Sequence, residues 1–230
     1  NITRIMGALQ ANGRVFIVNP AGVLFASGAQ VNVGSLVASS LNISNADFMA
    51  GRYAFVSQKD GGKVINKGEL IAQNQGLVAL LGEQVENDGV IVARKGTAAL
   101  AAGEEVTLDF NGDGKVEVIP DKAALTNVVD NKGLVEADGG LVFMTAAAGD
   151  KLTNSVVNQS GIIKAQSLGD ATGQVRLTGG NVSAERGSRI DISGQKGGTA
   201  EIIATNRTDF HGVIDAHGTV QGGQVETSGK

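Results

Sequence analysis

The sequence predicts an all-β protein folded as a right-handed parallel β-helix, and three observations support this prediction. Short apolar stretches rich in β-branched residues recur along the chain. Glycine accounts for 34 of 230 residues, about twice its usual share. Helical periodicity is almost absent, and residues 96–105, the one alanine-rich candidate, are interrupted by glycine within two turns.

One sequence motif repeats: a turn with Asn, Asp or Gly, then Gly, then a β-branched run that ends on a small residue. Its copies are residues 66–72, 87–93, 131–137, 159–165, 187–193 and 211–216. Successive glycines lie 21, 44, 28, 26 and 25 residues apart, and 44 is two periods enlarged by extra sequence around residues 109–120. Two or three strands per period describe one coil of a solenoid. About ten such coils, ~4.8 Å apart, would make a rod roughly 45–50 Å long.

Further strands are expected between the copies, at residues 77–81, 141–144, 174–178 and 200–204. Alternation predicts that Ile163 and Ile203 point into the coil, and the glycines are expected to supply positive φ angles at tight corners. The main alternative is a β-sandwich or barrel, which needs antiparallel strands every ~8–12 residues. Such folds also normally use more aromatic residues than the eight in this chain.

Composition excludes several mechanisms. The absence of cysteine rules out disulfides, a thiol nucleophile and thiolate metal sites. A net charge of −4 with 19 Lys and Arg residues gives no basic footprint, so nucleic acid is not expected as a partner. Apolar runs such as residues 98–102 are far shorter than the ~20 residues of a membrane helix, so no transmembrane segment is expected.

Residues 109–114 resemble the opening of a calcium loop, with Asp109, Asn111 and Asp113 at the first three ligand positions. The twelfth position holds Pro120 where a bidentate Glu is needed. A hairpin turn between residues 106–109 and 115–118 explains the same pattern, and we expect no metal or cofactor.

Two other groups of polar residues are candidates for chemistry. His211 and His217 flank one strand, but an extended strand would separate them by ~20 Å, so we expect surface or corner positions. Asp191, Asp215 and Glu226 lie about one coil apart, and stacking could bring some of them together as in a carbohydrate-active enzyme. Residues 144–230 contain no aromatic residue except Phe210 to bind a sugar, so a solvated outer ladder is favoured.

The first sixty residues differ from the rest. Residues 12–25 read as a strand, a turn at Asn19-Pro20-Ala21-Gly22, and another strand, with proline presetting φ at the second turn position. Together with neighbouring segments, this stretch resembles the secretion domain of filamentous-haemagglutinin-type exoproteins, the passengers of two-partner secretion. The other matching segments are residues 3–5, 9–13, 28–34, 36–39, 47–48, 51–55 and 100–110. The family usually has Asn where Ala21 stands, and its earlier Asn-Pro-Asn-Leu motif is missing from this sequence.

This resemblance implies an organisation and a function. Residues 1–125 would be the carboxy-terminal part of a secretion domain bearing short extra-helical hairpins, and residues 126–230 would be stalk coils, truncated at both ends. The protein would be a secreted cell-surface adhesin or filament, exported through a partner outer-membrane transporter, with a host-cell, surface or matrix receptor. Asn19, Pro20 and Gly22 would act in transporter recognition or as a structural turn. The alternatives are a β-helical carbohydrate-active enzyme and the stalk of a contact-dependent toxin.

Overall fold

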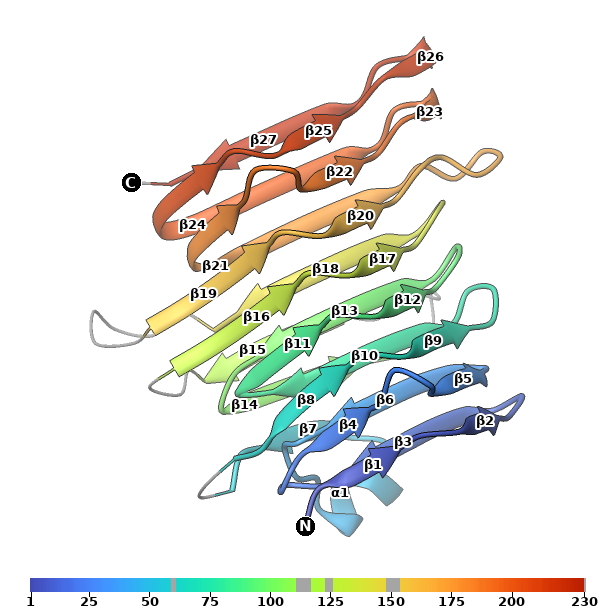
Figure 1. Ribbon diagram of the computed structural model, residues 1–230, viewed down its shortest axis with the longest axis vertical. Helices are drawn as coiled ribbons and strands as arrows, with labels where there is room; N and C mark the ends of the chain where they lie inside the picture. The colour runs from blue at the N-terminus through green and yellow to red at the C-terminus, as the bar shows by residue number, and fades with distance from the viewer. Residues whose placement is uncertain (59–60, 111–116, 123–125, 148–153, 230) are drawn as a thin grey trace.

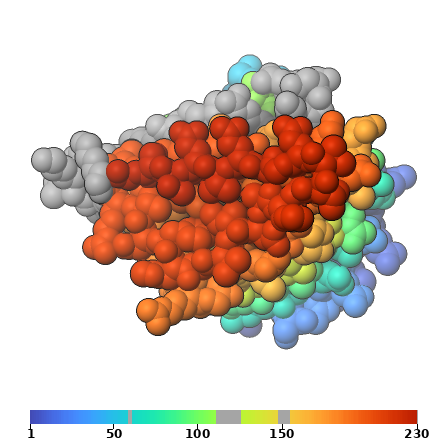
Figure 2. Space-filling view, turned by 90° about the horizontal axis from the view of Figure 1, so that it is seen from above, coloured from blue at the N-terminus to red at the C-terminus, as the bar shows by residue number. Residues whose placement is uncertain are grey.

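The recurring β-branched runs form strands that pair in parallel with the equivalent strands of the next coil. The computed structural model describes residues 1–58, 61–110, 117–122, 126–147 and 154–229. Within these residues, eight coils stack from the N-terminal to the C-terminal end (Figure 1). Seen along the stack, the last coil covers the end of the molecule, with earlier coils beneath it (Figure 2). The predicted parallel β-helix is therefore confirmed.

Each coil contributes one strand to each of three faces. The first face is made by β1 (Thr3–Ile5), β4 (Val23–Phe25), β8 (Lys63–Asn66), β11 (Gln84–Asn87), β16 (Thr126–Asn131), β19 (Asn154–Gln159) and the second halves of β21 (Gln174–Ala184) and β24 (Thr199–Phe210). The second face is made by β2 (Ala8–Gln10), β5 (Gln30–Val33), β9 (Glu69–Ala72), β12 (Val90–Val92), β17 (Leu134–Glu136), β20 (Ile162–Lys164), β22 (Arg189–Asp191) and β25 (Val213–Asp215).

The third face is made by β3 (Arg14–Val18), β6 (Ser35–Ser39), β10 (Leu77–Gly82), β13 (Thr97–Ala102), β18 (Leu141–Ala146), the first halves of β21 and β24, and β27 (Gln224–Ser228). A short pair, β23 (Gly194–Lys196) and β26 (Gly218–Gln221), extends the corner before this face. Residues 97–102 are thus a strand, in agreement with the rejection of a helix there.

Inward side chains form ladders because parallel register repeats the same position in every coil. On the first face, one ladder is Val64, Val85, Val129, Val157 and Val182. On the second, Leu70, Ile91, Val135, Ile163 and Ile190 form another. All ten side chains are at most 1% exposed, so the interior is a continuous aliphatic core. The inward position predicted for Ile163 is confirmed.

The inward position predicted for Ile203 is wrong. Ile202 and Ala204 are the buried residues of that strand, and Ile203 is only half-buried on its outer side. The polar Glu201 marks the outward phase of this strand, so alternation places Ile202 and Ala204 inside and Ile203 outside. The neighbouring coil agrees, since Ile202 is in register with the buried Leu177.

A buried amide ladder marks the corner between the first and second faces. It consists of the first residue of four copies of the repeated motif, each 0% exposed: Asn66, Asn87, Asn131 and Gln159. Each side-chain amide nitrogen donates a hydrogen bond of 2.8 Å to the amide oxygen of the next residue, and Gln159 donates to the Gly161 carbonyl oxygen. The repeated Asn therefore joins coils, in addition to marking a turn.

The glycine two residues further on is required by close backbone approach. A Cβ at Gly133 would lie 2.0 Å from the carbonyl oxygen of Gly89, and one at Gly161 would lie 2.1 Å from that of Gly133. None of these three glycines has a positive φ angle, contrary to the expectation. Among the motif glycines only Gly187, in a looser copy, has one. Inter-coil contact thus explains most of the repeated glycines.

Two inserts form an outer layer over the third face. The first contains α1 (Asn45–Met49) and β7 (Tyr53–Val56), and the second is the hairpin of β14 (Glu105–Asp109) and β15 (Glu117–Lys122). The strands form an antiparallel sheet in the order β15-β14-β7. The predicted extra-helical hairpin is confirmed. The inserts also explain why eight coils form where about ten were expected, because the described residues of both inserts build no coil.

Helix α1 was not predicted. Its local signal is a capping pair: the Ser44 hydroxyl accepts a hydrogen bond from the Asp47 backbone N–H and donates one to the Asp47 carboxylate. Hydrogen bonds from Ser44 and Arg52 hold the pKa of Asp47 below its usual range. A five-residue helix has too little periodicity to be visible in the sequence.

Candidate functional site

The turn at Asn19–Gly22 joins the first coil to the second. The Asn19 side-chain oxygen accepts a hydrogen bond from the Ala21 N–H at 2.9 Å, and the Asn19 carbonyl oxygen accepts one from the Gly22 N–H at 2.8 Å. The Asn19 amide nitrogen donates to Thr3 Oγ1 at 2.9 Å and to the Asn1 carbonyl oxygen at 3.1 Å. Asn19 thus closes the turn and ties it to the strand at the beginning of the chain.

Gly22 and Pro20 bind the same turn to the third coil. Gly22 has a φ of +116°, and a Cβ there would lie 2.9 Å from the Lys63 carbonyl oxygen. The Pro20 carbonyl oxygen accepts a hydrogen bond of 2.8 Å from the Gly62 N–H. Ala21 alone among the four turn residues is exposed. Asn19, Pro20 and Gly22 therefore make structural contacts, whereas the exposed side chain of Ala21 can be replaced without losing one.

The outer layer gathers most of the aromatic residues. Phe16 from β3 stacks on Tyr53 with ring centroids 5.5 Å apart, and Phe48 meets Phe16 edge-on at 5.1 Å. Phe110 packs edge-on against Tyr53 at 4.9 Å, with the Arg14 guanidinium 4.0 Å above its ring. The resemblance had marked several of these positions, but no local pattern indicates that the rings converge from three separated segments.

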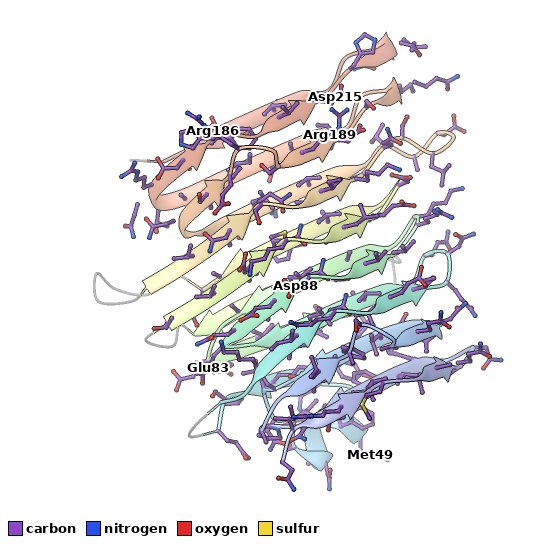
Figure 3. The ribbon with its side chains drawn as sticks, viewed as in Figure 1. Met49, Glu83, Asp88, Arg186, Arg189 and Asp215 are labelled. Carbon is purple, nitrogen blue, oxygen red and sulfur yellow. The ribbon has the colours of Figure 1, made fainter. Side chains whose placement is uncertain are left out.

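Two of the three candidate carboxylates come together on the second face. Asp191 and Asp215 occupy equivalent positions on β22 and β25, and Arg189 Nη2 lies 3.3 Å and 2.6 Å from their carboxylate oxygens. Figure 3 labels Arg189 and Asp215 on these neighbouring coils. Glu226 lies on the third face beside Glu201. Burial raises the pKa of Asp191, but hydrogen bonds from Ser193, Gln166 and Arg189 outweigh it and lower the pKa below its usual value. The pair is an ion-paired ladder in which Asp191 is buried, and not the solvated ladder of three carboxylates that the sequence had favoured.

The remaining candidates bring no ligands together. His211 and His217 are both exposed at the two ends of β25, as expected for corner residues. Of the calcium candidates, Asp109 ends β14, while Asn111 and Asp113 lie outside the described residues. Among the residues that the structure describes, no group of three or more His, Asp or Glu side chains could hold a metal ion.

A shallow depression of about 500 Å³ lies on the second face, lined by Ile71, Val92, Arg94 and the turn after β9. Its charged side chain, Arg94, already pairs with Glu136 at 2.8 Å. Over the described ranges, no helix is long and apolar enough to cross a membrane.

Stacked coils with an inserted outer layer define the chain as a β-solenoid protein. The family model for the TPS secretion domain matches residues 1–129, and the chain belongs to this family of two-partner secretion domains. Proteins of this family are exported through a partner outer-membrane transporter, which places this protein outside the cell or on its surface.

Relatives and a solved structure agree with this assignment. A heme/hemopexin-binding protein of Haemophilus influenzae strain KW20/Rd is 31% identical over 213 residues, which cover 90% of this chain and 22% of the relative. Another heme/hemopexin-binding protein of Haemophilus influenzae is 29% identical over 213 residues, covering 83% of this chain and 22% of the relative. The chain thus spans about a fifth of the length of these relatives. The crystal structure of the HMW1 secretion domain from Haemophilus influenzae matches with a TM-score of 0.78 at 26% identity, over all of this chain and 71% of that one.

Proposed function

We propose that this chain is the secretion region of a large exoprotein that acts at the bacterial surface as an adhesin or filament. The observation that supports the proposal best is the match of residues 1–129 to a secretion domain, followed by further coils of the same β-helix. A stack of coils is a rod, and a rod can hold a binding region away from the cell. The receptor would be a host-cell, surface or matrix molecule.

The proposed division places the secretion domain at residues 1–125 and the stalk at residues 126–230. Both inserts of the outer layer precede Thr126. On the third face, the outward positions after β18 become charged, with Arg176 paired to Glu201 at 2.6 Å. Phe143 of β18 still packs against the outer layer, so the third face becomes solvated about one coil after the proposed boundary, and the end of the inserts is the observation that supports the division.

The adhesin proposal is tested with the full exoprotein produced with and without its transporter in a non-adherent bacterial host. Expected results are surface display and attachment to host cells or matrix only when the transporter is present. Display without attachment would contradict the adhesin role and leave export intact. Added hemopexin serves as a second probe. Its capture by the displayed protein would favour heme/hemopexin binding, the activity for which the relatives are named, over adhesion.

We propose that Asn19, Pro20 and Gly22 act chiefly as a structural turn. Gly22→Ala is expected to lower both thermal stability and the secreted fraction, because its Cβ would meet the Lys63 backbone. Ala21→Ser, at the exposed position of the same turn, is the matched control and should change neither. A loss of secretion in Ala21→Ser at unchanged stability would instead show that the transporter recognises the turn itself.

The carbohydrate-active alternative has less support. A hydrolase of this kind needs two carboxylates that are free to reach the substrate. Here Arg189 lies between Asp191 and Asp215 and pairs with both. The toxin-stalk alternative shares the same secretion region, and a growth-competition assay with cells that produce the full exoprotein distinguishes it from an adhesin.

A further inference from the structure

The outward side of β6, β10 and β13 is mostly apolar and, apart from the half-buried Ser35, covered. In a solenoid this side of a strand usually meets water. Here it packs against Phe55 of β7 and against Val106 and Leu108 of β14. The covered outward residues, each at most 2% exposed, are Val37, Leu77, Ala79, Leu81, Ala99 and Ala101. These coils therefore have a second apolar core outside the helix.

The same row of positions becomes polar where the outer layer ends. Parallel register aligns Val37, Ala79, Ala99, Phe143, Arg176, Glu201 and Glu226 along the third face. The row is aliphatic under the outer layer, aromatic at its border and charged beyond it. Later coils can thus face water as soon as they form, whereas β6, β10 and β13 cannot.

The cover comes from inserts that are far apart in the chain. Strand β7 ends at Val56, and β14 begins at Glu105, after two complete coils. Among the described strands, β14 is the ladder partner of β7, with Phe55 opposite Val106; beyond it, β7 has an isolated bridge to Asn42. The first insert alone therefore leaves one edge of β7 unpaired and much of the apolar outward side of β6, β10 and β13 uncovered.

We propose that the coils before Thr126 fold as one cooperative unit, which closes when β14 docks, and do not fold coil by coil. An exposed aliphatic strip of this size and an unpaired strand edge both disfavour the partly folded states in which β14 is absent. For a chain exported through a transporter, the consequence is that the early coils become stable only after Asp109 has emerged.

The chain contains its own reporter of closure. Tyr53 is the single tyrosine, and tryptophan is absent. Its ring contacts Phe16 of the first coil and Phe110, the residue directly after β14. Tyrosine fluorescence therefore reports the docking of both inserts on the β-helix.

The test follows refolding of the full chain from urea. Tyrosine fluorescence measures closure, and pulsed hydrogen exchange measures protection of backbone amides in β6, β10 and β13. The expected result is one kinetic phase for both signals. Protection of β6 and β10 before the Tyr53 signal changes would overturn the proposal and show that coils form progressively.

Native-state hydrogen exchange of variants provides a second test. Leu108→Ala is expected to reduce protection throughout β6, β10 and β13 together, by about tenfold or more. Leu177→Ala removes an equally buried leucine from β21 and should leave these strands unchanged. A loss confined to β7 and β14 in Leu108→Ala would contradict the proposal. If Leu108→Ala does not fold, Leu108→Val is the milder substitution, and the wild-type refolding experiment needs no variant.

Discussion

Removal of the Asn87 side chain tests how much the buried amide ladder stabilises the β-helix. Asn87 accepts a hydrogen bond from Asn66 and donates one to Asn131, both at 2.8 Å. In Asn87→Ala, one buried donor and one buried acceptor lose these partners. The Asn66 amide nitrogen keeps only a longer contact of 3.4 Å with the Val90 carbonyl oxygen.

The magnitude follows from these two atoms. A buried polar group without its partner costs about 1–3 kcal/mol, so the two together predict a destabilisation of about 3 kcal/mol. For a chain of this size, 1 kcal/mol shifts the melting temperature by roughly 2–4 °C. We therefore expect Asn87→Ala to melt about 10 °C below the wild type.

Urea unfolding followed by circular dichroism measures the free energy directly. Asn74→Ala, in an exposed turn, is the matched control and should be neutral. The double variant Asn66→Ala/Asn87→Ala should be more stable than the sum of the two single changes predicts, because it also removes the orphaned donor. An Asn87→Ala variant within about 0.5 kcal/mol of the wild type would refute the reasoning.

Three further predictions concern backbone contact, core orientation and pH. Gly133→Ala should prevent normal stacking because its Cβ would lie 2.0 Å from a backbone oxygen, whereas Gly13→Ala, with nothing within 4 Å, should melt like the wild type. Ile163→Asp should unfold the chain by burying an unpaired charge, and Ile203→Asp, on the half-exposed side, should be tolerated in the same thermal melt. The lowered pKa of Asp191 means that its carboxylate stabilises the fold above the ordinary value of 3.8 and loses this effect as pH falls through the lower folded-state pKa. Asp191→Asn should therefore be less stable at neutral pH, with a flatter acid-unfolding curve; parallel curves would contradict this role.

Sequence periodicity was sufficient for the architecture because each coil repeats the same local requirements. The Val and Ile runs predicted strands, and Ile163 followed from alternation alone. Alternation fixes each adjacent isoleucine pair through a polar neighbour. Lys164 faces out and places Ile163 inside. Glu201 faces out and places Ile202 inside. The inward position expected for Ile203 was therefore an error of phase, and the register with the neighbouring coil confirms it.

Contacts between distant segments were the part that local pattern could not predict. Strand β7 resembles any exposed strand in isolation, and its pairing with β14 depends on two coils of intervening chain. Asp191 and Asp215 were recognised as one coil apart, but the arginine that pairs with both was not. The site residues Asn19, Pro20 and Gly22 were identified by motif, whereas their bonds to Thr3 and Gly62 required the fold.

The irregular period has a physical explanation in the corners. In four successive coils, β8 to β19, two residues separate the first-face strand from the second-face strand, and the amide ladder and the stacked glycines lie at this corner. Extra residues enter elsewhere: both inserts of the outer layer lie between the third and first faces. A ladder that fixes register at one corner allows chain length to vary at the others. Each repeat therefore keeps an amide residue and a glycine at this corner while its length changes from coil to coil. An outer layer can be added at another corner without disturbing the stack.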